Sequence, residues 1–361
     1  MGGIGRYCHE LAESAAKLGW AVTLFGPKSA GHSPAKDLPA YILRNGVHGP
    51  SLGTINLWKS RNQLLEEFLT DADSIHLLAE PGPILACGLL PRSAYPKDFR
   101  VVLHGSEIER WSSPMSVAGR IAARSIQLAD AIIVPSEAIA KKVRARFPST
   151  QNRIHVVHHA LPEFFKAAAV STLETKKDSM IGRINLLSVG RIHPRKGFDQ
   201  VLQALERLNS GEKIALSYTI AGSRCKSRYE HKLRELAKRS GCEVHFNLDP
   251  SDSELFNLYE KANLFALTSV PHRKSVEGFG LVYLEAAAFG LPSIAYRVGG
   301  VEAAVQDGKT GYLLSVQDPK SITEQLRAII QNPGVLLTLG SQARQQAFSR
   351  DWTDVAIESL P

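Results

Sequence analysis

The chain has 361 residues, a formal net charge of +8 at pH 7 and 44% hydrophobic residues. This length exceeds what one hydrophobic core usually holds, so two domains of roughly 150–200 residues are expected. No secretory signal opens the chain, and no apolar run reaches the ~18 residues of a membrane span. The four cysteines form no CxxC pair and no metal-ligand spacing with histidine, which favours a reduced, cytosolic compartment.

The basic charge favours contact with anions, which include nucleotide diphosphates, anionic lipid surfaces and nucleic acid. Many enzymes are mildly basic, so the charge alone does not choose among these partners. The sequence contains no basic motif interleaved with aromatic residues, no recognition-helix pattern and no zinc-finger pattern. We therefore expect no nucleic-acid partner.

The first part of the chain alternates short apolar runs with amphipathic stretches. Strands are predicted over Ala21–Phe25, Ser74–Leu78, Arg100–Leu103, Ala131–Val134 and Ile154–Val157. Helices are predicted over Gly5–Leu18, Leu57–Phe68, Ala118–Ala129 and Glu137–Arg146. This alternation is typical of parallel strands joined by crossover helices in a doubly wound sheet.

The pattern is interrupted over Glu163–Arg183 and then restarts. We interpret this segment as a connector between domains. Strands are predicted over Ile184–Val189, Ile214–Ala221, Glu243–Phe246, Leu264–Thr268, Ser293–Tyr296 and Gly311–Leu314. Helices are predicted over Gly197–Leu208, Tyr229–Ser240, Ser251–Lys261, Leu281–Phe289, Pro319–Gln331 and Val335–Phe348.

The predicted fold is therefore α/β, with two doubly wound domains and ligand sites at the carboxyl ends of the strands, facing a cleft. The first domain is expected to span residues 1–165 and the second residues 180–345. The tail, about residues 345–361, could pack back on the first domain.

The segment 276–290, with the sequence VEGFGLVYLEAAAFG, is the first candidate site. Its glycines let the backbone approach a ligand closely, and the helix predicted from Leu281 would offer free N–H groups near Gly280 to a phosphate. Glu277 and Glu285 could reach opposite ends of one ligand. The alternative is a glycine loop beside two solvated glutamates without a function. The AxAxGxP pattern that follows argues against a chance match.

The segment 188–199, with the sequence SVGRIHPRKGFD, is the second candidate. A strand is predicted to end at Val189, and a helix to begin after Lys196. Arg191 offers a planar fork and Lys196 a point charge, and together they could clamp a diphosphate. The alternative is a strand–helix turn with two solvated cations; the neighbouring glycine motif favours the diphosphate.

These two segments resemble those of the family 4 retaining glycosyltransferases, which have the GT-B architecture of two Rossmann-like domains. The similarity continues through the sequences PSIA at 292–295, GGVE at 299–302 and DGKTGY at 307–312. It covers most of the second domain with high specificity and the first domain more thinly.

The resemblance implies that Arg191 and Lys196 bind the donor diphosphate, that Glu277 contacts the donor sugar and that Glu285 holds the ribose hydroxyls. It implies a metal-independent reaction without a cofactor, in which the nucleotide-sugar donor is a substrate. The expected catalytic residues are His104, Arg191, Lys196 and Glu277, and the expected donor-binding residues are Gly3, Gly278, Phe279, Gly280, Leu281 and Glu285.

In the first domain, the sequence GGIGRY at 2–7 resembles the family's glycine loop at the start of the first helix, although Cys8 stands where a dinucleotide fingerprint needs its third glycine. His104, after a predicted strand, matches the family histidine that reaches the donor sugar. In an arbitrary protein such a histidine is more often structural. Glu107 and Glu109 could orient an acceptor hydroxyl.

Asp71 and Asp73 form a D-x-D string of the kind that metal-dependent transferases use. A metal-bridging pair should follow its strand, whereas this pair precedes the strand Ser74–Leu78. We interpret it as a helix-to-strand turn.

One departure concerns the first strand. Family members usually begin with a strand that leads into the glycine loop, and this sequence begins at the loop itself. Its absence would leave neighbouring strands without a hydrogen-bonding partner. Either a start site placed too far downstream or an altered, poorly active domain would explain the departure; we favour the first.

The predicted reaction is transfer of a sugar from a UDP- or GDP-sugar to a hydroxyl acceptor, in polysaccharide, lipopolysaccharide or glycolipid synthesis. The alternatives are a GT-B sugar-nucleotide epimerase and a non-catalytic sugar-nucleotide-binding protein.

Acceptors in the family are often lipid-linked sugars, which suggests a cytoplasmic enzyme on the inner face of a membrane. The candidate membrane-facing residues, which could equally be solvated helix faces, are Trp58, Lys59, Arg61, Arg120, Arg124, Lys141, Lys142, Arg144 and Arg146. Base recognition is expected near 222–224 and 246–248.

Overall fold

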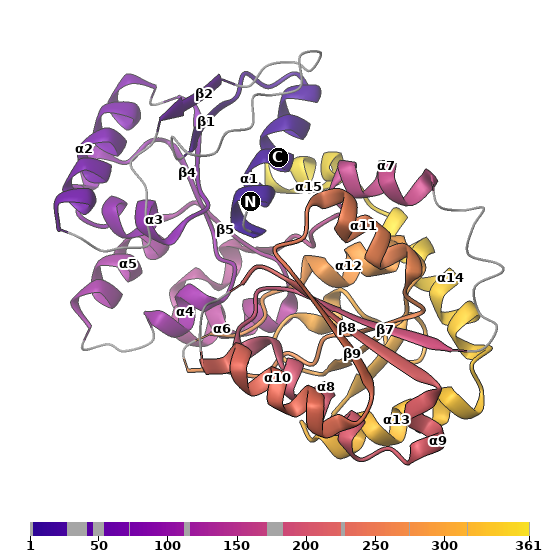
Figure 1. The fold of residues 1–361 in the computed structure, drawn as a ribbon. Helices are drawn as coiled ribbons and strands as arrows, with labels where there is room; N and C mark the ends of the chain where they lie inside the picture. Colours follow the sequence, from indigo (N-terminus) through magenta and orange to yellow (C-terminus); the bar gives the residue numbers. More distant parts are fainter. Residues whose placement is uncertain are drawn as a thin grey trace. The chain divides into compact units, whose positions relative to one another are not determined.

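The computed structural model describes residues 3–26, 42–45, 54–71, 73–111, 116–171, 183–224, 228–273, 275–315 and 317–360. These residues form two compact units (Figure 1). The first comprises Met1–His159 and the C-terminal segment Asp351–Pro361, and the second comprises Ala160–Arg350.

The first unit contains a four-stranded parallel sheet with the strand order β3-β4-β5-β6. Its strands are β3 (Ile75–Leu78), β4 (Asp98–Val102), β5 (Ala131–Val134) and β6 (Ile154–Val156). Strands β1 (Thr23–Gly26) and β2 (Ile42–Asn45) form a separate parallel pair. Within the described ranges β1 and β3 therefore share no ladder, and each has a neighbouring strand on one side only.

The helices of this unit follow the strands in the order of a doubly wound domain. They are α1 (Gly3–Lys17), α2 (Thr54–Thr70), α3 (Pro81–Cys87), α4 (Ser106–Arg110), α5 (Val117–Leu128) and α6 (Glu137–Arg146). Helix α6 has Ile139, Ala140 and Val143 as its buried residues, at the spacing of one helix face.

The C-terminal helix α15 (Trp352–Ser359) belongs to the first unit, where it packs on α1. Trp352 is fully buried, and its ring meets the ring of Tyr7 edge-on at 5.5 Å between centroids. The buried Arg100 of β4 donates to the carbonyl oxygen of Ser359 at 2.8 Å, which satisfies a carbonyl group at the end of α15. Burial of a tryptophan and this capping bond fix the tail on the first unit.

The second unit has one six-stranded parallel sheet with the order β12-β11-β10-β7-β8-β9. Its strands are β7 (Ile184–Val189), β8 (Leu216–Gly222), β9 (Glu243–Leu248), β10 (Leu264–Ala266), β11 (Ser293–Tyr296) and β12 (Gly311–Leu314). The chain starts at β7, moves outward to β9 and then returns to β10 on the other side of β7. The point where the strand order reverses therefore lies between β7 and β10.

The helices around this sheet are α7 (Glu163–Ser171), α8 (Phe198–Glu206), α9 (Ser210–Ile214), α10 (Arg228–Ser240), α11 (Asp252–Lys261), α12 (Leu281–Ala288), α13 (Pro319–Gln331) and α14 (Val335–Phe348). One hydrophobic cluster joins them to the strands, and Tyr218, Phe265 and Phe289 are among its largest fully buried members. Four central strands have almost continuously buried residues, as expected for a parallel sheet covered on both faces.

The predicted connector Glu163–Arg183 is partly wrong, because its first nine residues form helix α7. Phe165 and Ala169 lie one turn apart and are fully buried in the core of the second unit. The small residues that suggested a break are helix-forming alanines. Of the rest of the predicted connector, residues 172–182 lie outside the described residues.

Candidate functional site

The loops at the reversal point of the second sheet bring the two sequence motifs together. Residues 190–197 follow β7, and residues 267–280 lead from β10 to α12. In open parallel sheets, ligands bind in the crevice outside the carboxyl ends of the strands at such a point. The candidate site is therefore the edge formed by these two loops.

The Glu277 carboxylate lies at this edge and is anchored through one oxygen. Its Oε2 accepts hydrogen bonds from Arg195 Nη1 at 2.7 Å, from Lys196 Nζ at 2.8 Å and from Ser269 Oγ at 3.1 Å. The side chains of Arg195, Lys196 and Glu277 are only 10–11% exposed. Within the described part of the chain, all hydrogen bonds to this carboxylate go to Oε2, which leaves Oε1 as the oxygen that can accept from a ligand.

Two buried cations determine the charge of this carboxylate. Burial by itself would raise the pKa of Glu277, but the charges of Lys196 and Arg195 outweigh burial and lower the pKa to about 2. Burial lowers the pKa of the Lys196 ammonium, against the opposing attraction of Glu277. With one carboxylate between two cations, the cluster keeps a surplus positive charge for an incoming anion.

Two glycines with left-handed backbone hold the loops in this arrangement. At Gly299 (φ +56°) a methyl group would overlap the carbonyl oxygen of Glu277, and the N–H of Gly300 donates to that same oxygen at 2.9 Å. At Gly197 (φ +71°) a methyl group would overlap the carbonyl oxygen of Thr268. Glycine is needed at both positions because a side chain would be strained and would clash with backbone.

The glycine segment before α12 differs in detail from its predicted role. The ring of Phe279 is 3% exposed and packs in the core, so only the backbone of Gly278, Phe279 and Gly280 can face a ligand. Gly280 (φ +89°) precedes α12, whose first residue is Leu281, as predicted. The first N–H groups of α12 therefore lie directly behind the segment that carries Glu277.

Glu285 lies inside α12 and is 5% exposed. Its Oε2 accepts a hydrogen bond from the Tyr259 hydroxyl at 3.1 Å, and the Tyr259 ring stacks on Phe289 at 5.3 Å between centroids. This contact fixes the carboxylate against α11.

Arg191 adds further positive charge near Lys196, and His193 lies in the same loop. Arg191 is exposed, and its charge is one of the influences that lower the pKa of Lys196 after burial itself. The rings of His193 and His272 meet edge-on at 5.2 Å between centroids. Burial, His272 and the surrounding arginines lower the pKa of His193, so the His193 ring is neutral at neutral pH.

Arg195 is the residue at this edge that sequence reasoning missed. It precedes Lys196 directly, and neighbours in an ordinary helix or strand would not face the same group. The 3₁₀ turn Pro194–Lys196 and the left-handed Gly197 change this geometry and direct both side chains to Glu277. The sequence PRKG, with glycine after two adjacent cations, is the signal that could have found it.

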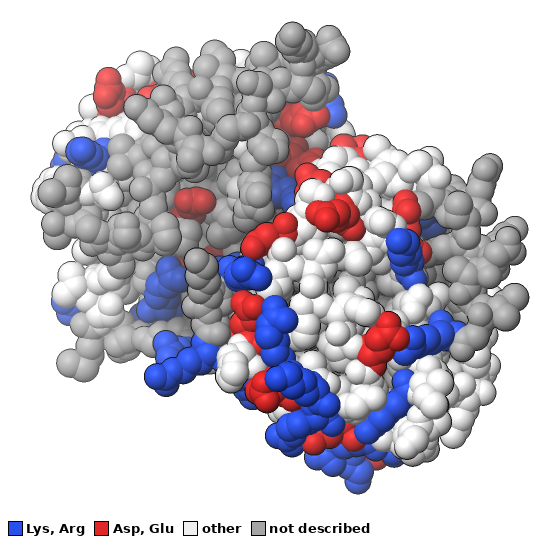
Figure 2. Space-filling model, viewed as in Figure 1, with Lys and Arg blue, Asp and Glu red and all other residues white. Residues whose placement is uncertain are grey.

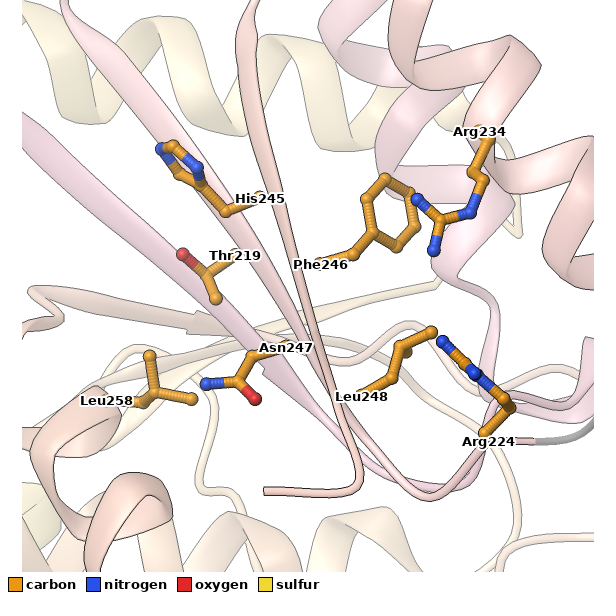
Figure 3. Close-up of a pocket in the computed structure, with 8 residues that line it drawn as sticks. All are labelled: Thr219, Arg224, Arg234, His245, Phe246, Asn247, Leu248 and Leu258. Carbon is orange, nitrogen blue, oxygen red and sulfur yellow. The ribbon is translucent and has the colours of Figure 1, made fainter. Parts of the chain in front are cut away.

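An open pocket of about 580 Å³ surrounds the second half of β9 (Figure 3). Its lining residues are Thr219, Arg224, Arg234, His245, Phe246, Asn247, Leu248 and Leu258. The Arg234 guanidinium lies over the Phe246 ring, 4.6 Å from its centroid. Neighbouring strands are about 4.8 Å apart, so β9 lies roughly 10 Å from β7, and the pocket overlaps the two segments where base recognition is predicted.

In the first unit, His104 lies just beyond the end of β4, as its position in the sequence indicates. Its Nε2 lies 3.1 Å from the carbonyl oxygen of Ala79, a geometry in which Nε2 donates and Nδ1 is left as an acceptor. The Tyr7 ring meets it edge-on at 5.2 Å between centroids. Burial lowers the pKa of His104, against the charge of Glu107, so the ring is neutral at neutral pH.

Glu107 and Glu109, which were expected to orient an acceptor, have partners within the first unit. The Glu107 side chain is buried, and its Oε1 accepts from the backbone N–H groups of His104 and Gly105. Glu109 forms an ion pair with Lys142. Glu107 therefore fixes the backbone at His104, and Glu109 links α4 to α6. Of the predicted glycine loop 2–7, Gly2 lies outside the described residues, and the residues from Gly3 onward form the start of helix α1.

The basic side chains proposed for a membrane surface are partly engaged within the first unit. Arg144 pairs with Glu137, and Arg124 donates to the carbonyl oxygen of Gly88. Trp58 is 56% exposed, with the Arg61 guanidinium over its ring at 5.1 Å. In the second unit, Lys and Arg side chains also gather over α10, interspersed with acidic residues (Figure 2).

Asp71 and Asp73 lie between α2 and β3, the helix-to-strand turn predicted for them. Asp73 forms an exposed ion pair with Lys97 at 2.5 Å. Across the described ranges, no cluster of three or more His, Cys, Asp or Glu residues is arranged to hold a metal ion. In the same part of the chain, no helix combines the length and the apolar character that membrane crossing requires.

Two family models match the chain, one in each half. Residues 1–162 match the model described as Glycosyltransferase Family 4, and residues 173–346 match the model described as Glycosyl transferases group 1. The second match contains Arg195, Lys196, Ser269 and Glu277, which together form the cation–carboxylate cluster.

Among curated proteins, a D-inositol 3-phosphate glycosyltransferase from Kribbella flavida is 27% identical over 395 residues, covering 99% of this chain and 89% of that protein. Proteins of the same name from Streptomyces bingchenggensis and Corynebacterium urealyticum are 30% identical, over 63% of this chain in each case. These two alignments cover 51% and 55% of the relatives, so the chain matches about half of their length.

Solved structures share the fold over nearly the whole chain. A sucrose-phosphate synthase from Thermosynechococcus elongatus has a TM-score of 0.74 at 22% identity, covering 99% of this chain and 92% of that one. Anabaena HepE in complex with UDP also has a TM-score of 0.74, at 17% identity, covering 99% of this chain and 94% of that one. At such identities the similarity concerns the fold.

Proposed function

This chain belongs to the family 4 glycosyltransferases of GT-B fold, and from that premise we propose that it transfers a sugar from a UDP- or GDP-sugar to a hydroxyl acceptor with retention of configuration. The second unit would bind the donor and the first unit would serve the acceptor. A solved structure with UDP bound supports a nucleotide donor.

The observation that carries this proposal is the pairing of Lys196 and Arg195 with Glu277 at the strand-order reversal of the second sheet. A diphosphate that leaves the sugar gains negative charge, and fixed cations in a buried site stabilise that charge strongly. Arg191 and Lys196 would bind the diphosphate. Because these cations neutralise it, the proposed reaction needs no metal ion.

The rest of the donor would lie along the same edge. Oε1 of Glu277 would accept hydrogen bonds from the sugar hydroxyls, and backbone N–H groups of 278–280 would donate to them. Glu285 would hold the ribose hydroxyls. The open pocket around β9 would take the base, with Phe246 and Arg224 beside it. Its distance of roughly 10 Å from β7 suits the length of a nucleoside diphosphate.

In the proposed mechanism the acceptor hydroxyl attacks the anomeric carbon from the face that the diphosphate leaves. The bond between that carbon and the phosphate oxygen breaks, the new glycosidic bond forms, and the acceptor proton passes to the diphosphate. The protein would contribute electrostatic stabilisation and orientation rather than a covalent nucleophile. His104 would contact the donor sugar near the reacting carbon.

The acceptor follows less directly from the residues. We propose a sugar or lipid-linked sugar in polysaccharide, lipopolysaccharide or glycolipid synthesis, on the cytoplasmic side of a membrane. Exposed Trp58 and the basic helices of the first unit support an anionic membrane surface. Co-sedimentation with vesicles should rise with anionic lipid content, and binding that ignores this content would contradict the membrane proposal.

Nucleotide release from UDP- and GDP-sugars, measured with and without acceptor, tests the function. The acceptor panel should include lipid-linked sugars and D-inositol 3-phosphate, the acceptor named for the curated relatives. Acceptor-dependent release is expected. Conversion of the donor without acceptor would indicate an epimerase, and binding without any conversion would indicate a non-catalytic protein.

A further inference from the structure

Two cations converge on one oxygen of Glu277, and the proposed function gives only one of them a contact with the donor. Lys196 would bind the diphosphate, whereas Arg195 has no assigned donor contact. Its side chain is nevertheless 11% exposed and its Nη1 lies 2.7 Å from Glu277 Oε2. Removing a guanidinium from water is costly, so a second buried cation needs a reason.

Arg195 is held rigidly at its backbone. Its N–H donates to His193 Nδ1 at 3.1 Å, and its carbonyl oxygen accepts from the N–H of Val270 at 2.9 Å. These two bonds tie its backbone to both loops of the site. Its planar guanidinium is 11% exposed and donates to Glu277 through Nη1, which holds it beside the carboxylate.

Lys196 differs in the freedom of its charged group. Its ammonium has three donors on a flexible stem, so it can turn toward a phosphate oxygen that arrives at the site. Lys196 would then interact with the diphosphate as well as with Glu277, so it would stabilise the charge of Glu277 less. Burial would favour protonation of Glu277, and a protonated Glu277 would present a different hydrogen-bonding pattern to the sugar.

The other groups that face Glu277 offer no positive charge. Ser269 donates a neutral hydrogen bond. The Tyr283 hydroxyl donates to the carbonyl oxygen of Leu267 at 2.6 Å, and burial, together with the charge of Glu277, raises the pKa of Tyr283, so it stays neutral. Among the described residues that contact the carboxylate, Arg195 and Lys196 are the two cations.

We propose that Arg195 is a positioning residue that holds the Glu277 carboxylate ionised and in place while Lys196 turns to the diphosphate of the donor. This inference rests on the proposed function, because it assumes that a diphosphate occupies the edge beside Lys196. Arg195 itself would touch neither the diphosphate nor the reacting carbon.

Carbon-13 NMR of glutamate-labelled protein tests the proposal through the titration of Glu277, whose signal is identified by its loss in Glu277→Gln. The wild type, Arg195→Gln, Arg195→Lys and the control Arg239→Gln are compared, each with and without UDP. Arg239 forms an exposed ion pair with Glu206 on the surface of the second unit. In the wild type and the control, Glu277 should stay ionised down to about pH 4 in both conditions.

In Arg195→Gln the pKa of Glu277 should rise by about one unit without UDP and by a further unit or more with UDP, because a nearby opposite charge shifts a carboxyl pKa by about 1–3 units. Arg195→Lys should restore most of the wild-type titration. If Glu277 titrates in Arg195→Gln as it does in the wild type, the proposal is overturned.

Turnover provides a second readout. The donor KM of Arg195→Gln should change less than about threefold, while its kcat falls relative to the wild type as pH drops toward about 4, where Glu277 of the variant becomes protonated, and recovers toward pH 7. A pH-independent loss in kcat would contradict a positioning role through Glu277. If UDP perturbs no signal of the wild type, the proposed donor site fails, and the nucleotide-free comparison still decides whether Arg195 controls Glu277.

Discussion

At the reversal point of the second sheet, charged side chains hold one another in place, whereas beyond β4 of the first sheet His104 is held by rings and backbone. Glu277 accepts from two cations and a hydroxyl. His104 has the Tyr7 ring on one side, and Glu107 binds its backbone N–H rather than its ring. The first environment retains positive charge at neutral pH, whereas in the second the His104 ring is neutral.

This difference separates two tasks that a sugar transferase must perform. Charge develops on the leaving diphosphate, and a buried surplus of cations suits that position. The attacking hydroxyl and the sugar are neutral, and a neutral ring whose Nδ1 can accept a hydrogen bond suits them. Substitutions in the second unit should therefore produce the larger losses of activity.

The largest effect is expected from Lys196→Ala. Loss of one preorganised donor to developing negative charge costs about 3–4 kcal/mol of barrier, so kcat should fall about a hundredfold or more. Arg239→Gln, on the surface of the same unit, is the matched control and should keep normal turnover. A near-normal rate for Lys196→Ala would reject its assignment to the diphosphate.

A smaller effect, on stability, is expected from Gly299→Ala. The new methyl group would overlap the Glu277 carbonyl oxygen in a strained backbone, which should destabilise the protein by about 2–3 kcal/mol in urea unfolding. The same substitution at Gly3, where a methyl group meets nothing within 4 Å, provides the comparison in the first unit. Equal stability of the two variants would contradict the close packing of Gly299 against the carbonyl oxygen of Glu277.

The pH dependence of stability should reveal the buried carboxylate. Because the pKa of Glu277 is lowered to about 2, its contribution is present above the unfolded-state pKa of about 4.3 and is lost as pH falls toward 2. Between pH 5 and pH 3 the wild type should therefore lose about 1.5 kcal/mol more than Glu277→Gln. Urea unfolding at both pH values measures this, and parallel losses would show that Glu277 is not held ionised by its partners.

A loss of about tenfold in kcat, equivalent to about 1.4 kcal/mol, is expected for His104→Ala. Because burial lowers the pKa of His104, the ring stays neutral above pH 6.5 and the loss should be constant from there to pH 8. Steady-state kinetics across that range provide the check. A loss that grows as pH falls within this range would mean that the protonated ring takes part.

The smallest effect is expected at the D-x-D string. Asp73→Asn removes an exposed ion pair with Lys97, and turnover should stay within about twofold. Addition of EDTA should be equally harmless if cationic side chains replace a metal ion. A strong effect of either treatment would require a metal ion in the reaction.

The sequence predicted the fold class and most boundaries, because parallel strands and amphipathic helices have strong periodic patterns. The predicted bounds of β7, β11, α6 and α14 agree with the structure. The sequence did not predict α7, because its many small residues obscure the helical spacing of the buried Phe165 and Ala169. Short elements such as α3, α4 and α9 lack the length for a periodic signal.

The site could be predicted as a set of residues but not as a network. Lys196 and Glu277 are 81 residues apart, and the motifs placed both at one ligand. Arg195 was missed because its direction depends on a 3₁₀ turn and a left-handed glycine. The hydrogen bonds of Glu107 to two backbone N–H groups were not predicted, because they depend on the local turn after β4.

The central claim is that the cation–carboxylate cluster of the second unit binds the diphosphate of a nucleotide-sugar donor. Isothermal titration calorimetry with UDP and GDP, on the wild type, Lys196→Gln and Arg239→Gln, tests it most directly. At least one nucleotide should bind the wild type and Arg239→Gln equally and bind Lys196→Gln at least about tenfold more weakly. Equal affinity of Lys196→Gln and the wild type for that nucleotide would contradict the claim.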